Sequence, residues 1–190
     1  MLLLAAHYVL DLAAVVRGKG SVGSASEWAN APLQRLYLEA VDILELGYQK
    51  SPHNFQMRLL LLRLYNRLGN VPRALDYFEK LHVKHVQLDT LSQLIIPSLT
   101  EFGFADAAAD MCNHVSHFHA RADREMAEYE RTAYEHRNFT KIVELAKFHR
   151  RLLQSSQRVI CDSYLLDYGL RHNLKDPKTY LQHSMVRSLP

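Results

Sequence analysis

The chain has 190 residues, of which 48% are hydrophobic and 23% charged, and its formal net charge is +3. This balance is that of an ordinary soluble globular protein, and the net charge is too small to indicate nucleic acid as the partner. The two cysteines, Cys112 and Cys161, lie far apart within amphipathic patterns. That placement favours reduced thiols in the cytoplasm over a disulfide framework.

Residues 1–17 predict an apolar N-terminal helix that packs on several sides, because its hydrophobic residues nearly encircle it. His7 and Asp11 interrupt the apolar run and no basic region precedes it, which disfavours a signal peptide and a membrane span. Residues 18–32 read as a flexible linker of small residues. Its one bulky residue, Trp28, is able to dock back on a neighbouring helix.

A first helix is predicted over residues 33–49, and residues 51–81 are predicted to form two further helices. Gly69-Asn70 is a typical left-handed helix stop, and Pro72 suits the first turn of the second helix. Small or apolar residues then recur 34 positions apart in one register: Ala40, Ala74 and Ala108; Leu44, Phe78 and Cys112; Gly47, Leu81 and Val115; and Gly69 with Gly103. This period predicts an all-α, tetratricopeptide-like solenoid of antiparallel helical hairpins over residues 33–157.

The helical pattern of residues 88–95 runs into Pro97, which predicts a kink or a short break. Gly103 is expected to end this element, and a partner helix is expected over residues 105–119. A fourth hairpin is then expected from residues 121–136 and 140–153.

The fourth hairpin departs from the repeat, because Ile142 and Arg137 stand where the earlier repeats have alanine and glycine. Its packing is therefore expected to be looser or differently angled. Residues 158–190 are predicted as a C-terminal helix, ended by Gly169, and a tail. Neither end shows a polar capping repeat, so we expect a fragment of a longer array.

The sequence offers no catalytic or cofactor-binding motif, since it lacks a nucleophile elbow, a zinc-protease motif and a phosphate-binding glycine loop. The cluster of Cys112, His114, His117 and His119 is a poor metal site. On a helix His114 and His117 point about 140 to 160° away from the other two side chains. No metal site and no enzyme active site are therefore predicted.

Two polar segments are candidates for partner binding. The first is the junction between repeats, with Lys84, His85, Gln87 and Asp89, where capping of the next helix by Asp89 or Thr90 is the alternative. The second is residues 136–158, which hold six Lys or Arg against one acid. A partner or phosphate surface and a merely solvated face both fit this charge. Its candidate residues are Arg137, Lys141, Lys147, Arg150 and Arg151.

Three sequence pieces carry a family resemblance across residues 33–159. They are Ser-Pro-His-Asn at 51–54, Lys-His-Val-Gln-Leu-Asp-Thr-Leu at 84–91 and Phe-Thr-Lys-Ile-Val-Glu at 139–144. With them the chain resembles the tetratricopeptide-rich auxiliary subunit of the N-terminal acetyltransferase B complex.

The resemblance implies a non-catalytic, cytoplasmic scaffold. It would bind the catalytic subunit, which itself holds acetyl-CoA and modifies nascent chains that begin with Met and an acidic or amide residue. It also implies docking on ribosomes, which the basic segment would suit. No cofactor on this chain and no membrane contact are implied.

Two other functions stay open from the residues alone. One is a generic tetratricopeptide adaptor for an acidic peptide or a chaperone tail. The other is an RNA-binding repeat, which needs a base-reading side chain that recurs in each repeat. Arg58 does not recur in this way, because Ser92 and Met126 occupy the equivalent positions.

Overall fold

The computed structural model describes residues 1–18 and 31–172, which fall into two compact units, Met1–Val83 and Lys84–Pro190. Nearly all of the predicted linker, Trp28 included, and the predicted tail beyond residue 172 lie outside the described residues. Within the described ranges every regular element is a helix, which confirms the all-α prediction.

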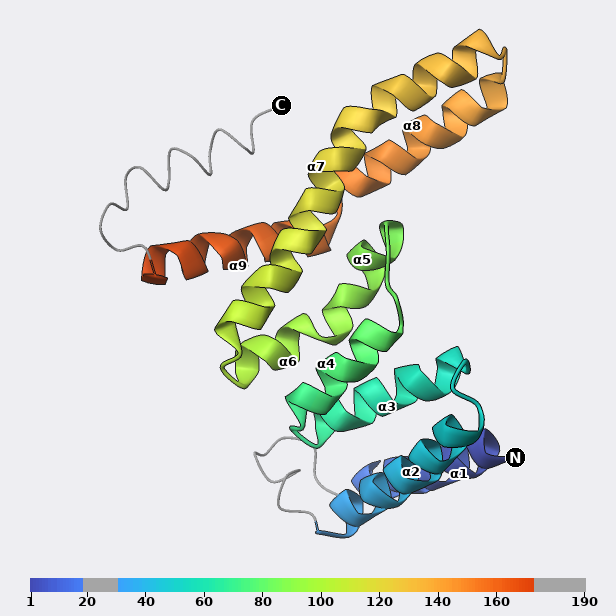
Figure 1. Ribbon diagram of the computed structural model, residues 1–190, viewed down its shortest axis with the longest axis vertical. Helices are drawn as coiled ribbons and strands as arrows, with labels where there is room; N and C mark the ends of the chain where they lie inside the picture. The colour runs from blue at the N-terminus through green and yellow to red at the C-terminus, as the bar shows by residue number, and fades with distance from the viewer. Residues whose placement is uncertain (19–30, 173–190) are drawn as a thin grey trace. The chain divides into compact units, whose positions relative to one another are not determined.

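The first unit consists of α1 (Leu2–Gly18), α2 (Ala31–Lys50), α3 (Phe55–Arg67) and α4 (Val71–Lys80). Each helix packs on the next in chain order, α1 on α2, α2 on α3 and α3 on α4 (Figure 1). The largest side chains of its core that are fully buried are Leu44, Leu61, Leu62, Val71 and Tyr77. Successive hairpins thus stack as a solenoid requires.

The second unit begins with α5 (Val86–Leu91), the 3-10 helix η2 (Ser92–Leu94) and α6 (Ile96–Glu101), and continues with α7 (Ala105–Glu135), α8 (Phe139–Leu153) and α9 (Ser156–His172). Figure 1 shows α8 returning beside the second half of α7, while α9 crosses the first half. The break between η2 and α6 confirms the effect predicted for Pro97, which lies in the first turn of α6.

Three asparagines begin helices by the same chemistry. The side chains of Asn54, Asn70 and Asn138 accept hydrogen bonds from backbone N–H groups in the first turns of α3, α4 and α8. These bonds satisfy amide groups that have no partner inside the helix. Each helix start is therefore fixed by the local sequence.

The predicted repeat register agrees with burial. Ala40, Ala74 and Ala108 are all fully buried, as are Leu44 and Cys112 at the next recurring position. A residue with a small side chain at these points lets the helices approach closely.

One predicted boundary is wrong: residues 105–135 form the single helix α7 rather than two helices separated near residue 120. Its sequence contains no glycine or proline, so nothing interrupts the backbone hydrogen bonds. Buried residues continue from Phe118 and His119 to Met126 and Ala133. Because α7 is this long, it contacts α6 and α9 along one stretch and α8 along another.

The predicted stop at Gly169 is also wrong, since α9 continues to His172 and Gly169 is buried inside it. A glycine inside a helix costs only about 1 kcal/mol, which packing can offset. The α9 helix packs against α7, and this contact stabilises the helical backbone on both sides of the glycine.

Positive φ values occur among the described residues at Gly69 (72°), Gly103 (79°), His82 (51°), His85 (53°) and Arg137 (53°). Gly69, Gly103 and Arg137 lie in the turns that follow α3, α6 and α7. The predicted stops at Gly69 and Gly103 are confirmed. Arg137 adopts the same conformation with a side chain, which is strained by about 1 kcal/mol.

Opposite stability changes are expected at two of these turns. A Cβ added at Gly103 meets nothing within 4 Å, so Gly103→Ala should lower the free energy of unfolding by about 1 to 2 kcal/mol through backbone strain alone. Arg137→Gly relieves the strain at its own turn and should raise the free energy of unfolding by about 0.5 to 1 kcal/mol. Urea unfolding of both variants measures the changes, and equal shifts of the same sign would contradict this assignment.

Candidate partner-binding surfaces

The junction between the repeats presents three of its four predicted residues to solvent. Lys84, His85 and Gln87 are exposed at the start of α5. The backbone N–H of Lys84 donates to the side-chain carbonyl of Gln87 at 3.3 Å, and Nη2 of Arg121 lies 3.4 Å from Nδ1 of His85. The Lys84 ammonium and the His85 ring are thus placed where a partner can reach them.

Asp89 points inward instead. Its side chain is 18% exposed, and its Oδ1 lies 2.9 Å from Nε2 of His119, which is 1% exposed. The Ser155 hydroxyl donates to the same carboxylate oxygen. Asp89 therefore joins α5 to α7 and to the residue before α9. The capping alternative is wrong, because Asp89 lies inside α5 and no side chain caps the N-terminus of that helix.

The basic segment is solvent-exposed at all five candidate positions. Arg137 lies in the turn before α8, and Lys141 pairs with Glu144 at 3.3 Å. Such an exposed pair adds little stability. A sixth basic residue, Arg158, binds Asp123 at 3.0 Å and is used inside the unit.

The sequence interpretation missed the outer face of α8. Phe139 (61% exposed), Val143 (52%) and Leu153 (56%) lie on one side of this helix. With Ala146 and Arg150 they follow the spacing i, i+4, i+7, i+11, i+14, which places all five on one stripe, here called the α8 face.

The opposite side of α8 explains why this stripe remains exposed. Ile142, Leu145 and Phe148 are half-buried and Leu152 is buried, on the side toward α7. The helix therefore carries apolar residues on two sides and uses one of them within the described structure. This two-sided pattern was visible in the sequence and is the signal that could have found the surface.

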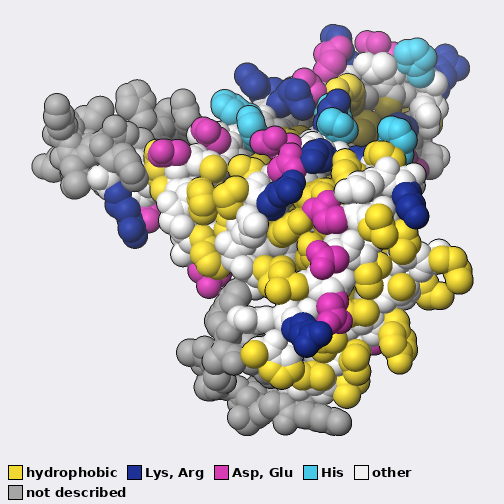
Figure 2. Space-filling view, turned by 60° about the horizontal axis from the view of Figure 1, so that its bottom comes forward, with side chains coloured by type: hydrophobic (Ala, Val, Ile, Leu, Met, Phe, Trp, Pro, Cys, Tyr) yellow, Lys and Arg dark blue, Asp and Glu magenta, His cyan; other side chains and the backbone are white. Residues whose placement is uncertain are grey.

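A second apolar stripe lies on α1 of the first unit. Leu4, Tyr8, Leu12 and Val15 are all exposed and share one side of the helix. Hydrophobic side chains also lie among charged ones over the face in view in Figure 2. Exposed apolar surface rimmed by charge is typical of protein interaction sites.

The two cysteines are buried in the second unit, and the Cys112 thiol is poorly suited to nucleophilic or metal chemistry. Both thiols are fully buried and free of a disulfide. A hydrogen bond with Cys161, and then burial, raise the pKa of the Cys112 thiol well above its usual range. A thiol that stays protonated at neutral pH is a poor nucleophile and a poor metal ligand.

Two kinds of site are absent from residues 1–18 and 31–172. No three His, Cys, Asp or Glu side chains converge there to hold a metal ion. None of the helices described is long and apolar enough to cross a membrane.

Comparison with known proteins gives a consistent family. Residues 1–186 match a family model described as the N-acetyltransferase B complex (NatB) non catalytic subunit. The chain is 31% identical over 174 residues to the rat protein named N-alpha-acetyltransferase 25, NatB auxiliary subunit. The aligned residues cover 90% of the chain and 16% of the rat protein. It is 32% identical over 149 residues to the human protein of that name, covering 77% of the chain and 15% of the human protein.

A fungal relative agrees with the mammalian ones. The N-terminal acetyltransferase B complex subunit arm1 of Schizosaccharomyces pombe is 30% identical over 155 residues, which cover 80% of the chain and 19% of that protein. The chain thus spans less than a fifth of the length of each of these relatives. The family match extends over almost the whole sequence, so the chain belongs to the family of non-catalytic subunits of the N-acetyltransferase B complex.

Proposed function

We propose that this chain is part of a non-catalytic scaffold that binds the catalytic subunit of the N-terminal acetyltransferase B complex and positions it for co-translational acetylation of nascent chains. The observation that carries the proposal is the family match over residues 1–186. In this proposal acetyl-CoA is held by the catalytic partner, and the assembly works in the cytoplasm at the ribosome.

The exposed surfaces support a binding role. Fully desolvated aromatic and aliphatic side chains supply most of the affinity of a protein interface, and charges at its rim set orientation and association rate. The α8 face has this composition, with Phe139 and Val143 as anchors and Arg150 among them. The neighbouring basic residues Lys147 and Arg151 would suit an acidic partner surface or the ribosome.

The α8 face can be tested directly. Phe139→Ala and Arg150→Glu, each made in the full-length protein, are expected to weaken binding of the catalytic subunit by about tenfold or more. Both residues are exposed, so the folded state should change little. Titration calorimetry measures the affinity, and circular dichroism checks the fold.

Two matched variants control this test. Phe102→Ala removes an exposed aromatic ring outside the α8 face, and Arg124→Glu reverses an exposed positive charge on α7. Both should bind as the unchanged protein does. Normal binding by all four variants would show that the catalytic subunit does not use the α8 face.

A further inference from the structure

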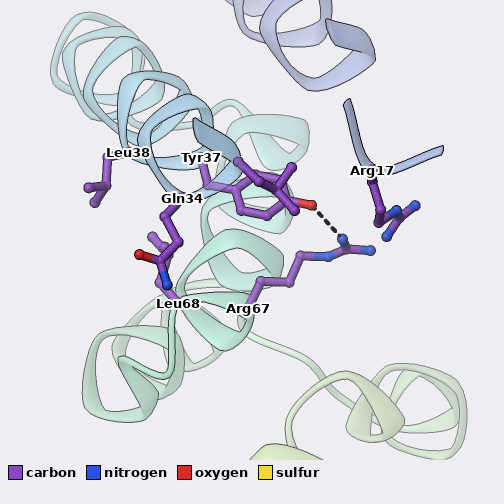
Figure 3. A pocket seen from close by; sticks show the side chains of 7 residues that line it. Arg17, Gln34, Tyr37, Leu38, Arg67 and Leu68 are labelled. Carbon is purple, nitrogen blue, oxygen red and sulfur yellow. Dashed lines mark hydrogen bonds between the residues drawn. The ribbon is translucent and has the colours of Figure 1, made fainter. Parts of the chain in front are cut away.

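The first unit contains a pocket of about 350 Å³ where the end of α1, the start of α2 and the end of α3 meet. This volume lies within the range of about 300–1,000 Å³ that is usual for ligand pockets. The lining residues are Arg17, Leu33, Gln34, Tyr37, Leu38, Arg67 and Leu68 (Figure 3). The pocket thus combines two guanidinium groups, one phenol and one amide with three leucines.

The polar groups of the pocket are arranged to meet an anion. Nη1 of Arg67 donates to the Tyr37 hydroxyl at 3.0 Å, and the guanidinium carbon lies 5.7 Å from the centre of the Tyr37 ring. Because that hydroxyl accepts from Arg67, its own proton can be donated to a ligand. Figure 3 shows the guanidinium of Arg17 on the same side of the pocket as that of Arg67.

The charge of the pocket is uncompensated by its lining. Both arginines are exposed, and none of the described residues that line the pocket is acidic. Two like charges beside one another repel, and a bound anion removes that repulsion. Guanidinium groups bind carboxylates in a planar, two-point geometry, which makes Arg the usual residue for this task.

Apart from the amide of Gln34, the remaining lining is apolar and indicates what else the ligand carries. Leu33 is buried, Leu68 is half-buried and Leu38 is exposed at the pocket. A phosphate-rich ligand would leave these leucines without a contact and would call for more than two cations. A carboxylate next to an apolar side chain fills both parts of the lining.

We propose that this pocket binds an acidic peptide segment, with one carboxylate between Arg17 and Arg67 and an adjoining apolar side chain against Leu33, Leu38 and Leu68. The site lies on a different unit from the α8 face and needs no acetyltransferase subunit. The peptide site can therefore be present or absent whether or not the proposed scaffold function is correct.

The test uses the whole chain and three defined probes. They are the blocked peptides acetyl-Leu-Glu-Leu-amide and acetyl-Leu-Gln-Leu-amide, and inorganic phosphate. Binding is followed by NMR through the side-chain Nε–H signals of Arg17 and Arg67 and the ring signals of Tyr37. The glutamate peptide is expected to bind at least about tenfold more tightly than the glutamine peptide.

Variants assign the binding to this pocket. Arg17→Gln and Arg67→Gln should each weaken the glutamate peptide by about tenfold, and Tyr37→Phe by a smaller factor. Arg63→Gln changes the net charge equally on an exposed position of α3 that does not line the pocket. It should bind the peptide as the unchanged chain does, which separates a specific contact from general attraction.

Each of the following results would contradict the proposal. Equal binding of the two peptides would make the pocket an apolar groove with no carboxylate site. Phosphate binding as tightly as the glutamate peptide would make it a simple anion site. Absence of signal changes with every probe would show that no peptide binds here. Equal losses in the Arg63 variant would show general charge attraction in place of a specific site.

Discussion

Replacement of Glu45 by alanine is expected to lower the free energy of unfolding of the first unit by about 3 kcal/mol. The two oxygens of its carboxylate accept hydrogen bonds from the hydroxyl groups of Tyr65, at 2.5 Å, and Tyr77, at 2.7 Å. Both tyrosines are buried, and their rings stack with centroids 5.8 Å apart. Alanine leaves two buried hydroxyl groups without a partner, and each costs about 1 to 3 kcal/mol.

The loss should be confined to the unit that contains these residues. Hydrogen exchange of the α2 and α3 amides measures it directly, and the α8 amides serve as an internal reference. Glu39→Ala is the matched control, because that exposed carboxylate on α2 pairs only with Arg35 in the described structure. Its effect should stay within about 0.5 kcal/mol. Equal effects of the two variants would contradict the proposed role of Glu45.

The same contact predicts a loss of stability in alkaline solution. Burial, and then the hydrogen bond to Glu45, raise the pKa of Tyr65 and of Tyr77 well above its usual range. Above about pH 10 the unfolded chain has released these protons while the folded chain still holds them. The contribution of the two tyrosines to the free energy of unfolding should therefore be constant below about pH 10 and should fall above it, by up to about 2.7 kcal/mol per pH unit. The double variant Tyr65→Phe, Tyr77→Phe should lose this slope.

The second large effect is expected at Asp89, where alanine should lower the free energy of unfolding of the second unit by about 3 kcal/mol. His119 would lose the partner of its Nε2, and Ser155 would lose the acceptor of its hydroxyl. Nδ1 of His119 already has no hydrogen-bond partner within the described structure. The ring would then be buried with neither nitrogen satisfied.

Conservative and distant variants make this prediction specific. Asp89→Asn keeps an acceptor oxygen of the same shape and should cost about half as much. Lys84→Ala, at an exposed position of the same junction, should change stability by less than about 0.5 kcal/mol. Urea unfolding measures the free energy of unfolding of Asp89→Ala, Asp89→Asn and Lys84→Ala. If the Asp89→Ala protein keeps its stability but binds the catalytic subunit less well, Asp89 acts as a binding residue instead of a structural one.

Features set by neighbouring residues could be predicted from the sequence. The left-handed turns at Gly69 and Gly103 and the break before Pro97 each follow from the geometry of one residue. The alanines that recur in the 34-residue register are also fully buried, as a close approach of helices requires. These are local properties of the backbone or periodic properties of a repeat.

Features set by distant residues could not be predicted in this way. The continuity of α7 and the glycine inside α9 depend on packing between these helices. The inward direction of Asp89 depends on partners 30 and 66 positions away. The pocket needs residues from three helices, of which Arg17 and Arg67 are ordinary helix-end arginines in the sequence. Single-sequence reasoning has no access to such pairings.

The most direct test of the scaffold account is co-purification. The full-length protein and a version without residues 33–159 are each expressed with the catalytic acetyltransferase subunit, and acetylation of a peptide beginning Met-Asp is assayed on the recovered complex. The account predicts that the full-length protein retains the catalytic subunit with activity and that the deletion weakens this retention. Failure of the full-length protein to hold the catalytic subunit, or unchanged retention after the deletion, would contradict it.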